Sequence, residues 1–190
     1  MIRIIALAEL AAFYACYFGK MLAQRRQGIR TDQLGSGKTG RQKYVELGVM
    51  ILSVTTVLAE LVSIAAGTTA LPDWLRWTGA VIAAAGVALF ITAVVTMRDS
   101  WRAGVPQEKT ELVTGGVFRI SRNPAFVGFD LVYVGMLLMF FNWALAVITL
   151  AAMTAFHLQI IWSEEPALER MFGEAYTDYC GRVRRYLGRK

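Results

Sequence analysis

Histidine, cysteine and proline are scarce in this 190-residue chain, which has one, two and four of them. Cys16 lies in an apolar run and Cys180 near the C-terminus, so the two cysteines make no disulfide framework. We also expect no metal site. Charged residues are only 18% of the chain, whereas apolar residues make up 56% and occur in long runs. This composition predicts an integral membrane protein.

Apolar runs of the length that crosses a bilayer, on the order of 20 residues, occupy 4–22, 45–66 and 74–97. The stretch 124–162 is too long for one crossing, and Asn142-Trp143 in its middle suits a tight turn between antiparallel helices. No small-residue cleavage site follows the first run, so we expect it to be retained. The prediction is an all-α bundle of about five transmembrane helices with a cytoplasmic C-terminal helix.

Basic residues in short loops predict the orientation, because such loops tend to stay in the cytoplasm. The loop after the first run has one acid, Asp32, and several basic residues: Arg25, Arg26, Arg30, Lys38, Arg41 and Lys43. The tail carries Arg170, Arg182, Arg184, Arg185, Arg189 and Lys190. We expect both segments and 98–123 in the cytoplasm, with the N-terminus outside. Attraction to anionic lipid accounts for the net charge of +6, so we expect no nucleic-acid partner.

Polar motifs are unevenly distributed along the chain, which we divide into two parts of one structural domain. Residues 1–97 hold three apolar runs and a basic, glycine-rich loop, and residues 98–190 hold the polar motifs. Glu9 and Glu60 are acids within apolar runs, where ionisable groups are functional candidates. We expect them to face the bundle interior or polar neighbours, and expect the chemistry in the second part.

The first polar motif precedes the fourth predicted span, where residues 114–128 read TGGVFRISRNPAFVG. Gly115 and Gly116 permit unusual backbone angles, and Pro124 suits the first turn of a helix. Free backbone N–H groups at that helix start favour an anionic group, and Arg122 offers a bidentate contact to a carboxylate. The alternative is that Arg122 anchors the helix to lipid phosphates.

The second polar motif, Glu164-Glu165, ends the fifth predicted span at Pro166. Two acids at a helix C-terminus oppose the macrodipole, so a cationic ligand group or Arg122 is expected to compensate; the alternative is solvated surface charge. Helical spacing puts His157 on the face of Glu164, about 10 Å deeper. His157 is therefore a candidate for lining the same pocket, with a structural interfacial histidine as the alternative.

An apolar stripe at helical spacing follows Pro166 and is broken at Gly173. We expect this segment to lie against the membrane or to cover the site. Arg182, Arg184 and Arg185 on its other side suit interfacial anchoring.

The two motifs, TGGVFRISRNPAFVG and EEPALERMFGEAYTDYCGRV, resemble the integral membrane methyltransferases of the isoprenylcysteine carboxyl methyltransferase family. A related branch comprises phospholipid N-methyltransferases. The resemblance covers roughly residues 108–183. It implies an S-adenosylmethionine pocket on the cytoplasmic side, formed by the loop before the fourth span and the acids after the fifth.

Several residues match family positions that contact the cofactor. They are Gln107, Glu111, Leu112, Val113, Gly116, Phe118, Arg122, Asn123, Pro124, Ala125 and Glu164. We expect Arg122 to bind the cofactor carboxylate, Glu164 its ammonium or ribose hydroxyls, and Glu165 to help position the reactants. His157 is a candidate substrate contact.

The chain departs from the family pattern at three places. Asn123 stands where histidine is usual, Phe118 and Phe126 stand where tyrosine is frequent, and residues 160–162, Ile-Ile-Trp, replace basic residues that often precede the acids. These changes remove charge and hydroxyl groups from the expected site.

The resemblance implies methyl transfer from S-adenosylmethionine to a lipophilic acceptor that enters from the bilayer. We expect carboxyl O-methylation of an isoprenylcysteine-like acceptor, with N-methylation of a phospholipid or other lipid amine as the alternative. An amine must lose a proton, for which Glu165 or His157 would be the nearest base. Two other classes stay open: a membrane lipid reductase with a nicotinamide cofactor, and a non-enzymatic scaffold.

Overall fold

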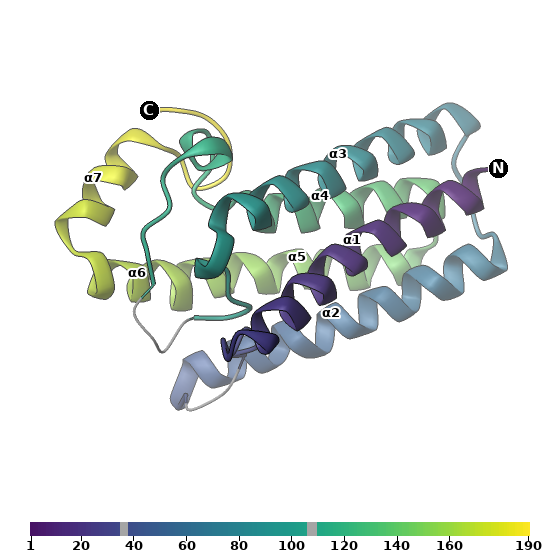
Figure 1. Ribbon diagram of the computed structural model, residues 1–190. Coiled ribbons are helices and arrows are strands. Elements are labelled where there is room, and N and C mark those ends of the chain that lie inside the picture. The colour runs from purple at the N-terminus through teal and green to yellow at the C-terminus, as the bar shows by residue number, and fades with distance from the viewer. Residues whose placement is uncertain (35–37, 106–109) are drawn as a thin grey trace.

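The computed structural model describes residues 1–34, 38–105 and 110–190. The long helices in these ranges are α1 (Ile2–Arg26), α2 (Gly40–Ala66), α3 (Asp73–Met97), α4 (Pro124–Met139) and α5 (Trp143–Gln159). A π-helical turn (Ile160–Glu164) joins α5 to α6 (Glu165–Phe172), and α7 (Glu174–Arg182) follows. Short 3-10 turns occupy Arg98–Ser100 and Gly116–Arg119. Figure 1 shows α1 to α5 as one bundle, with α6, α7 and the tail at the end away from the N-terminus.

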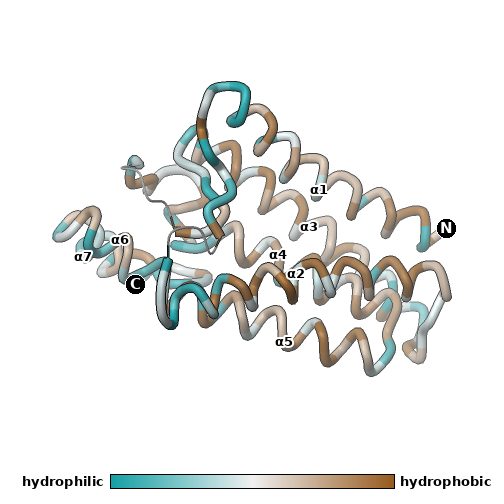
Figure 2. The backbone as a smooth tube through the Cα atoms, turned by 90° about the horizontal axis from the view of Figure 1, so that it is seen from below, coloured by the Kyte–Doolittle hydropathy of each residue, from teal (hydrophilic) through white to brown (hydrophobic). Residues whose placement is uncertain are grey.

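The predicted all-α membrane bundle is confirmed. Four helical stretches are long and apolar enough to cross a membrane: Ile2–Arg26, Gly40–Ala66, Asp73–Ser100 and Trp143–Phe172. Figure 2 shows hydrophobic residues along these helices and hydrophilic ones mainly at the loops and the C-terminal end. The fourth helix, α4, is shorter than expected: its 16 residues span roughly 24 Å.

The turn predicted at Asn142 separates α4 from α5. The Asn142 side chain accepts a hydrogen bond from the backbone N–H of Leu145 at 2.9 Å, which caps the start of α5. Its amide also donates to the Ser63 hydroxyl at 2.9 Å and thereby ties the turn to the end of α2. Asn142 thus caps α5 and links the turn before it to α2.

Glycines allow α3 and α4 to pack closely. A Cβ added at Gly135 would lie 2.6 Å from the backbone oxygen of Gly79, and one at Gly86 would lie 2.8 Å from the backbone oxygen of Gly128. Such contacts exclude any side chain, as is typical of small-residue interfaces between membrane helices. Next to this interface, Glu60 is 1% exposed in the bundle interior, as expected, and Glu9 is half-buried.

The loop after α1 is bound to the segment after α3, although about 70 residues separate them in the sequence. Asp32 and Ala103 form an isolated parallel bridge, with Gln33 N donating to Ala103 O at 2.9 Å. The buried Gln24 side chain accepts from the Thr31 hydroxyl at 2.6 Å and donates to Trp101 O at 3.2 Å. The basic loop therefore forms part of the polar end of the bundle.

The C-terminal tail folds back onto the loop that leads into α4. Gly188 N donates to Ile120 O at 2.7 Å, and Arg122 N donates to Arg184 O at 3.1 Å. The Tyr179 hydroxyl of α7 donates to Phe118 O at 2.6 Å. As expected, the helical stripe is interrupted at Gly173, where φ is +54°. α7 and the tail thus hold the motif that contains Arg122.

Candidate functional site

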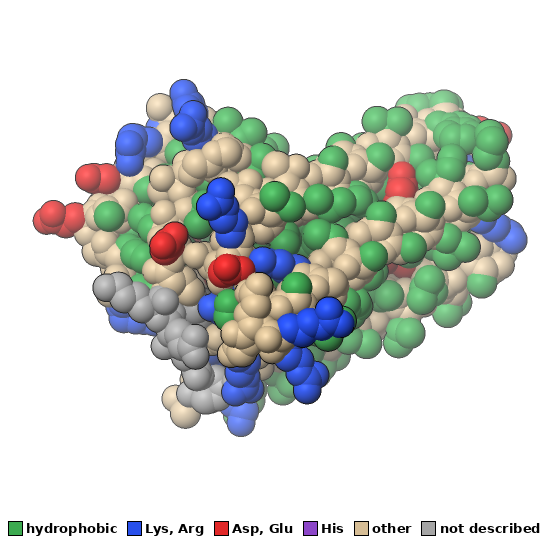
Figure 3. Space-filling model, in the orientation of Figure 1, with side chains coloured by type: hydrophobic (Ala, Val, Ile, Leu, Met, Phe, Trp, Pro, Cys, Tyr) green, Lys and Arg blue, Asp and Glu red, His purple; other side chains and the backbone are tan. Residues whose placement is uncertain are grey.

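A cavity of about 580 Å³ lies at the polar end of the bundle and extends between its helices. Its size is within the range of small-molecule and cofactor sites. In Figure 3, basic and acidic side chains gather mainly at this end, whereas hydrophobic side chains cover the helices. The lining falls into two groups of residues, a polar arm and an apolar arm.

The polar arm is formed by the segment after α3, the loop before α4, the end of α5 and α7. It has basic residues (Arg102, Arg122), acids (Asp32, Glu111, Glu164) and neutral polar or aromatic residues (Ser100, Trp101, Asn123, Gln159, Tyr176, Tyr179). Charges of both signs in one cavity suit a ligand that itself carries both signs.

The apolar arm is lined by residues of α1, α2, α3 and α4. Its lining includes Tyr14, Tyr17, Phe18, Val49, Met50, Val54, Val57, Leu58, Phe90 and Phe129. Four of these residues are also exposed on the outside of the bundle: Phe18 by 54%, Met50 by 44%, Val54 by 56% and Leu58 by 58%. The apolar arm therefore reaches the lateral surface between α1 and α2.

Most of the residues predicted to contact a cofactor line this one cavity. They are Glu111, Leu112, Val113, Phe118, Arg122, Asn123, Pro124, Ala125 and Glu164. Asn123 and Glu164, which belong to different motifs, share the cavity. Gln107 lies outside the residues that the structure describes.

Gly116, Glu165 and His157 were predicted for the site but are not among the described residues that line the cavity. Gly116 has φ +56°, and a Cβ there would lie 3.1 Å from Thr96 Cγ2, so it serves a close turn against α3. Glu165 instead binds two arginines beside the cavity. His157 is exposed and contacts the Tyr186 hydroxyl of the tail.

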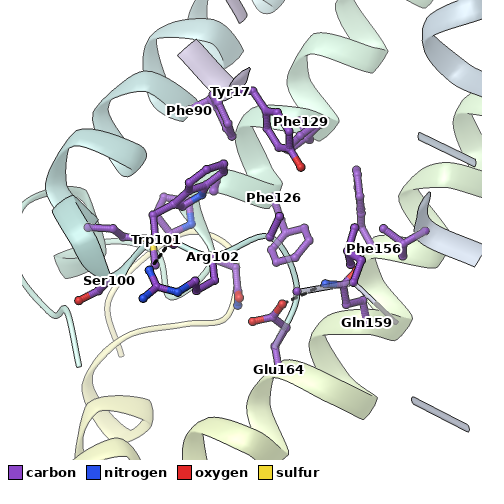
Figure 4. Close-up of a pocket in the computed structure, with 18 of the residues that line it drawn as sticks. Tyr17, Phe90, Ser100, Trp101, Arg102, Phe126, Phe129, Phe156, Gln159 and Glu164 are labelled. Carbon is purple, nitrogen blue, oxygen red and sulfur yellow. Dashed lines mark hydrogen bonds between the residues drawn. The ribbon is translucent and has the colours of Figure 1, made fainter. Parts of the chain in front are cut away.

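The π-helical turn explains where His157 lies. The prediction assumed α-helical spacing between residues 157 and 164, but residues 160–164 form a π-helix, which places residues five apart next to each other. Gln159, five residues before Glu164, consequently donates from Nε2 to Glu164 Oε1 at 3.0 Å. Figure 4 shows this pair in the cavity. Gln159, and not His157, therefore lines the cavity together with Glu164.

Arg122 lies at the edge of the polar arm in a cluster of charges. Its Nη2 is 2.9 Å from Glu165 Oε1, and its Nη1 donates to the Tyr176 hydroxyl at 3.3 Å and to Cys180 Sγ. Arg185 donates two hydrogen bonds to the same carboxylate, at 2.9 and 2.7 Å, and these raise the pKa of the Arg185 guanidinium. Two cations thus share one anion, and Arg122 Nε is buried with no hydrogen-bond partner in the ranges that the structure describes.

The two tyrosines of α7 keep their protons at neutral pH. Burial raises the pKa of Tyr179 to about 12 and also raises the pKa of Tyr176, because the charged phenolate is poorly solvated in the protein interior. The Tyr179 hydroxyl therefore stays a hydrogen-bond donor to the loop before α4.

Sequence reasoning missed several residues of the polar arm. Trp101 and Arg102 follow α3 and enter the cavity (Figure 4), and the Arg102 Nε is buried without a partner among the described residues. Asp32 is placed there by the bridge between loops, for which the sequence has no local signal. Gln159 had a signal, because a glutamine in an apolar run must find a polar environment.

A family model matches the part of the chain that forms most of the polar arm. A family model described as phospholipid methyltransferase matches residues 74–175. Over 113 residues, 58% of this chain, the sequence is 32% identical to protein-S-isoprenylcysteine O-methyltransferase of Mus musculus and 31% identical to protein-S-isoprenylcysteine O-methyltransferase B of Arabidopsis thaliana. The match covers 40% of the mouse protein and 57% of the Arabidopsis protein, less than two thirds of either. Because the family model matches more than half of its length, the chain belongs to the phospholipid methyltransferase family.

Proposed function

We propose that this protein transfers a methyl group from S-adenosylmethionine to a lipophilic acceptor at the membrane surface. The observation that carries the proposal is the single cavity in which Asn123 before α4 and Glu164 after α5 meet, continuous with an apolar arm. Family membership supports the reaction class.

The polar arm fits the cofactor by its unpaired groups. Nε of Arg102 and Nε of Arg122 are buried donors that find no partner in the described part of the chain, and such donors suit a carboxylate. Glu164 and Glu111 offer acceptors for an ammonium or for ribose hydroxyls. When bound, the cofactor supplies an electrophilic methyl group, and the chain's own residues align the reactants and exclude water.

The apolar arm fits a lipid tail. Its lining is aromatic and aliphatic, and it reaches the lateral surface between α1 and α2. A lipophilic acceptor can therefore move from the bilayer into the cavity without passing through water. The basic loops flank the polar arm. This supports the proposed orientation, with the N-terminus outside and the site and C-terminus in the cytoplasm.

Carboxyl O-methylation of an isoprenylcysteine-like acceptor is the form of the reaction we propose. A carboxylate is ionised at neutral pH and needs no general base, whereas an amine does. The two bases considered for an amine, Glu165 and His157, do not line the cavity, and Glu165 is bound by two arginines. The names of the two relatives agree with a carboxylate acceptor. The family description keeps lipid amine N-methylation as the alternative.

Calorimetric titration of the purified protein with S-adenosylhomocysteine tests the cofactor site. We expect saturable binding by the wild type and binding weakened about tenfold or more in Arg122→Ala and Glu164→Ala, because each loses a charge-assisted contact. Glu174→Ala, an exposed acid of α7, is the matched control and keeps wild-type affinity. Unchanged affinity in both site variants would refute the assigned roles.

A separate assay identifies the product. Membranes that contain the protein are incubated with methyl-labelled S-adenosylmethionine and N-acetyl-S-farnesylcysteine, and the product is treated with alkali. A methyl ester releases volatile labelled methanol, as we predict. Label that resists alkali after incubation with a lipid amine in place of the cysteine derivative would instead support N-methylation.

A further inference from the structure

Gln159 lines the cavity and has a buried acceptor oxygen that finds no hydrogen-bond partner among the described residues. The side chain is 2% exposed and lines the cavity at the end of α5. Its Nε2 donates to Glu164 Oε1 at 3.0 Å, while its Oε1 is buried and has no hydrogen-bond partner among the described residues. A buried carbonyl oxygen without a donor loses the hydrogen bonds it makes in water. A bound molecule with an N–H or O–H group would restore one.

The orientation of the Gln159 amide follows from its neighbour. The oxygen and nitrogen of a glutamine amide are distinguished by their hydrogen bonds. In the structure the NH₂ group of Gln159 faces Glu164, whose carboxylate oxygen accepts its hydrogen bond, and the carbonyl oxygen is the atom left for a ligand. The π-helical turn fixes this arrangement because it brings residues 159 and 164 together.

Gln159 lies where the two arms of the cavity meet. Phe126 and Phe156, whose ring centroids are 5.4 Å apart, stand beside it and belong to the cavity lining (Figure 4). Phe156 also packs in a cluster with Val49, a residue of the apolar arm on α2. Glu164, with its charge, is on the polar side. A lipophilic acceptor therefore places its polar end near Gln159 when its tail lies in the apolar arm.

We propose that Gln159 is a specificity-determining residue for the methyl acceptor. Its Oε1 accepts a hydrogen bond from an N–H or O–H group that the acceptor carries beside the group that is methylated. This inference rests on the proposed function. It implies that an acceptor with such a donor is preferred to one of the same length that lacks it, because the latter leaves Oε1 unpaired.

A matched pair of acceptors tests the inference. N-acetyl-S-farnesylcysteine has an amide N–H next to its carboxylate, and 3-(farnesylthio)propanoic acid lacks it. We expect the wild type to prefer the first by about tenfold in kcat/KM, the effect of one buried hydrogen bond. Gln159→Met, which keeps the volume but removes the amide, should reduce the preference to about twofold or less, because it slows the first acceptor more than the second.

A purely structural role for Gln159 gives a different result. If the residue only holds Glu164, Gln159→Met weakens S-adenosylhomocysteine binding and slows both acceptors equally, which would overturn the inference. Ser163→Ala is the control: Ser163 is buried in the same π-helical turn, does not line the cavity, and its hydroxyl has no partner among the residues described. It should keep the wild-type preference. Failure of the wild type to methylate either acceptor would instead count against the proposed function.

Discussion

The hydroxyl of Tyr179 joins α7 to the loop that carries Arg122 and Asn123, and its removal tests whether the C-terminal segment holds the site together. Tyr179 is 4% exposed, and its hydroxyl donates to Phe118 O at 2.6 Å and to Ser121 O at 3.3 Å. Tyr179→Phe keeps the ring and leaves both buried carbonyl oxygens without this donor. Loss of this donor should lower the free energy of unfolding by about 1–3 kcal/mol. For a chain of this size, 2 kcal/mol lowers the Tm by roughly 4–8 °C.

The assay is thermal unfolding of the detergent-purified protein, followed by titration with S-adenosylhomocysteine at 25 °C. We expect a lower Tm and weaker binding for Tyr179→Phe, because the loop loses its link to α7. Tyr44→Phe, which changes a side chain that is 74% exposed, is the control and should match the wild type. Equal Tm values and affinities for Tyr179→Phe and the wild type would refute the role of this contact.

The same contact has a predicted pH dependence. Because burial raises the pKa of Tyr179 to about 12, above its ordinary value near 10, the hydroxyl stays protonated below pH 10 in both folded and unfolded chains. The difference in Tm between the wild type and Tyr179→Phe should therefore be constant from pH 6 to 9. It should shrink above pH 10, where the unfolded chain ionises first and the stabilisation is lost.

Three further substitutions have defined outcomes. Gly135→Val places a side chain against the backbone of α3 and should lower the free energy of unfolding by about 1–3 kcal/mol. Gly19→Val is the control, because the space around its Cβ position is open. Equal Tm values for the two variants would contradict the close packing. Val54→Trp should raise KM for N-acetyl-S-farnesylcysteine about fivefold, by roughly 1 kcal/mol of crowding in the apolar arm, and unchanged KM would count against entry there. Glu165→Gln leaves Arg122 and Arg185 without their counter-charge. We expect the free energy of unfolding to fall by about 1–3 kcal/mol, and by less in high salt. A Tm equal to that of the wild type at every salt concentration would contradict this.

The features predicted well from the sequence depend on residues close together in the chain. The length of the apolar runs determines which helices can cross a membrane, and Asn142 caps the start of α5 through its own side chain. Gly173 interrupts the terminal stripe because glycine adopts its positive φ without strain. Asn123 and Glu164 line one cavity because α4 and α5 are antiparallel, so the start of α4 and the end of α5 lie on the same side of the bundle.

The features missed depend on contacts between distant segments or on a local change of helix type. The bridge between Asp32 and Ala103 brings the first loop into the site, although the sequence pattern predicts the chemistry in residues 98–190. The π-helical turn rotates the end of α5, so Gln159 faces the cavity and His157 does not. The pairing of two loops leaves no repeating pattern of residues in the sequence. The same is true of the extra residue in a π-helical turn.

The most direct test of the account is an experimental structure of the protein with S-adenosylhomocysteine bound. We predict that the ligand lies in the polar arm and contacts Arg102 or Arg122 with its carboxylate, Glu164 with its ammonium or ribose, and the segment 111–113 along one side. A ligand bound between α1 and α2, or at a place that contacts only one of the two motifs, would contradict the central claim that both motifs form one cofactor site.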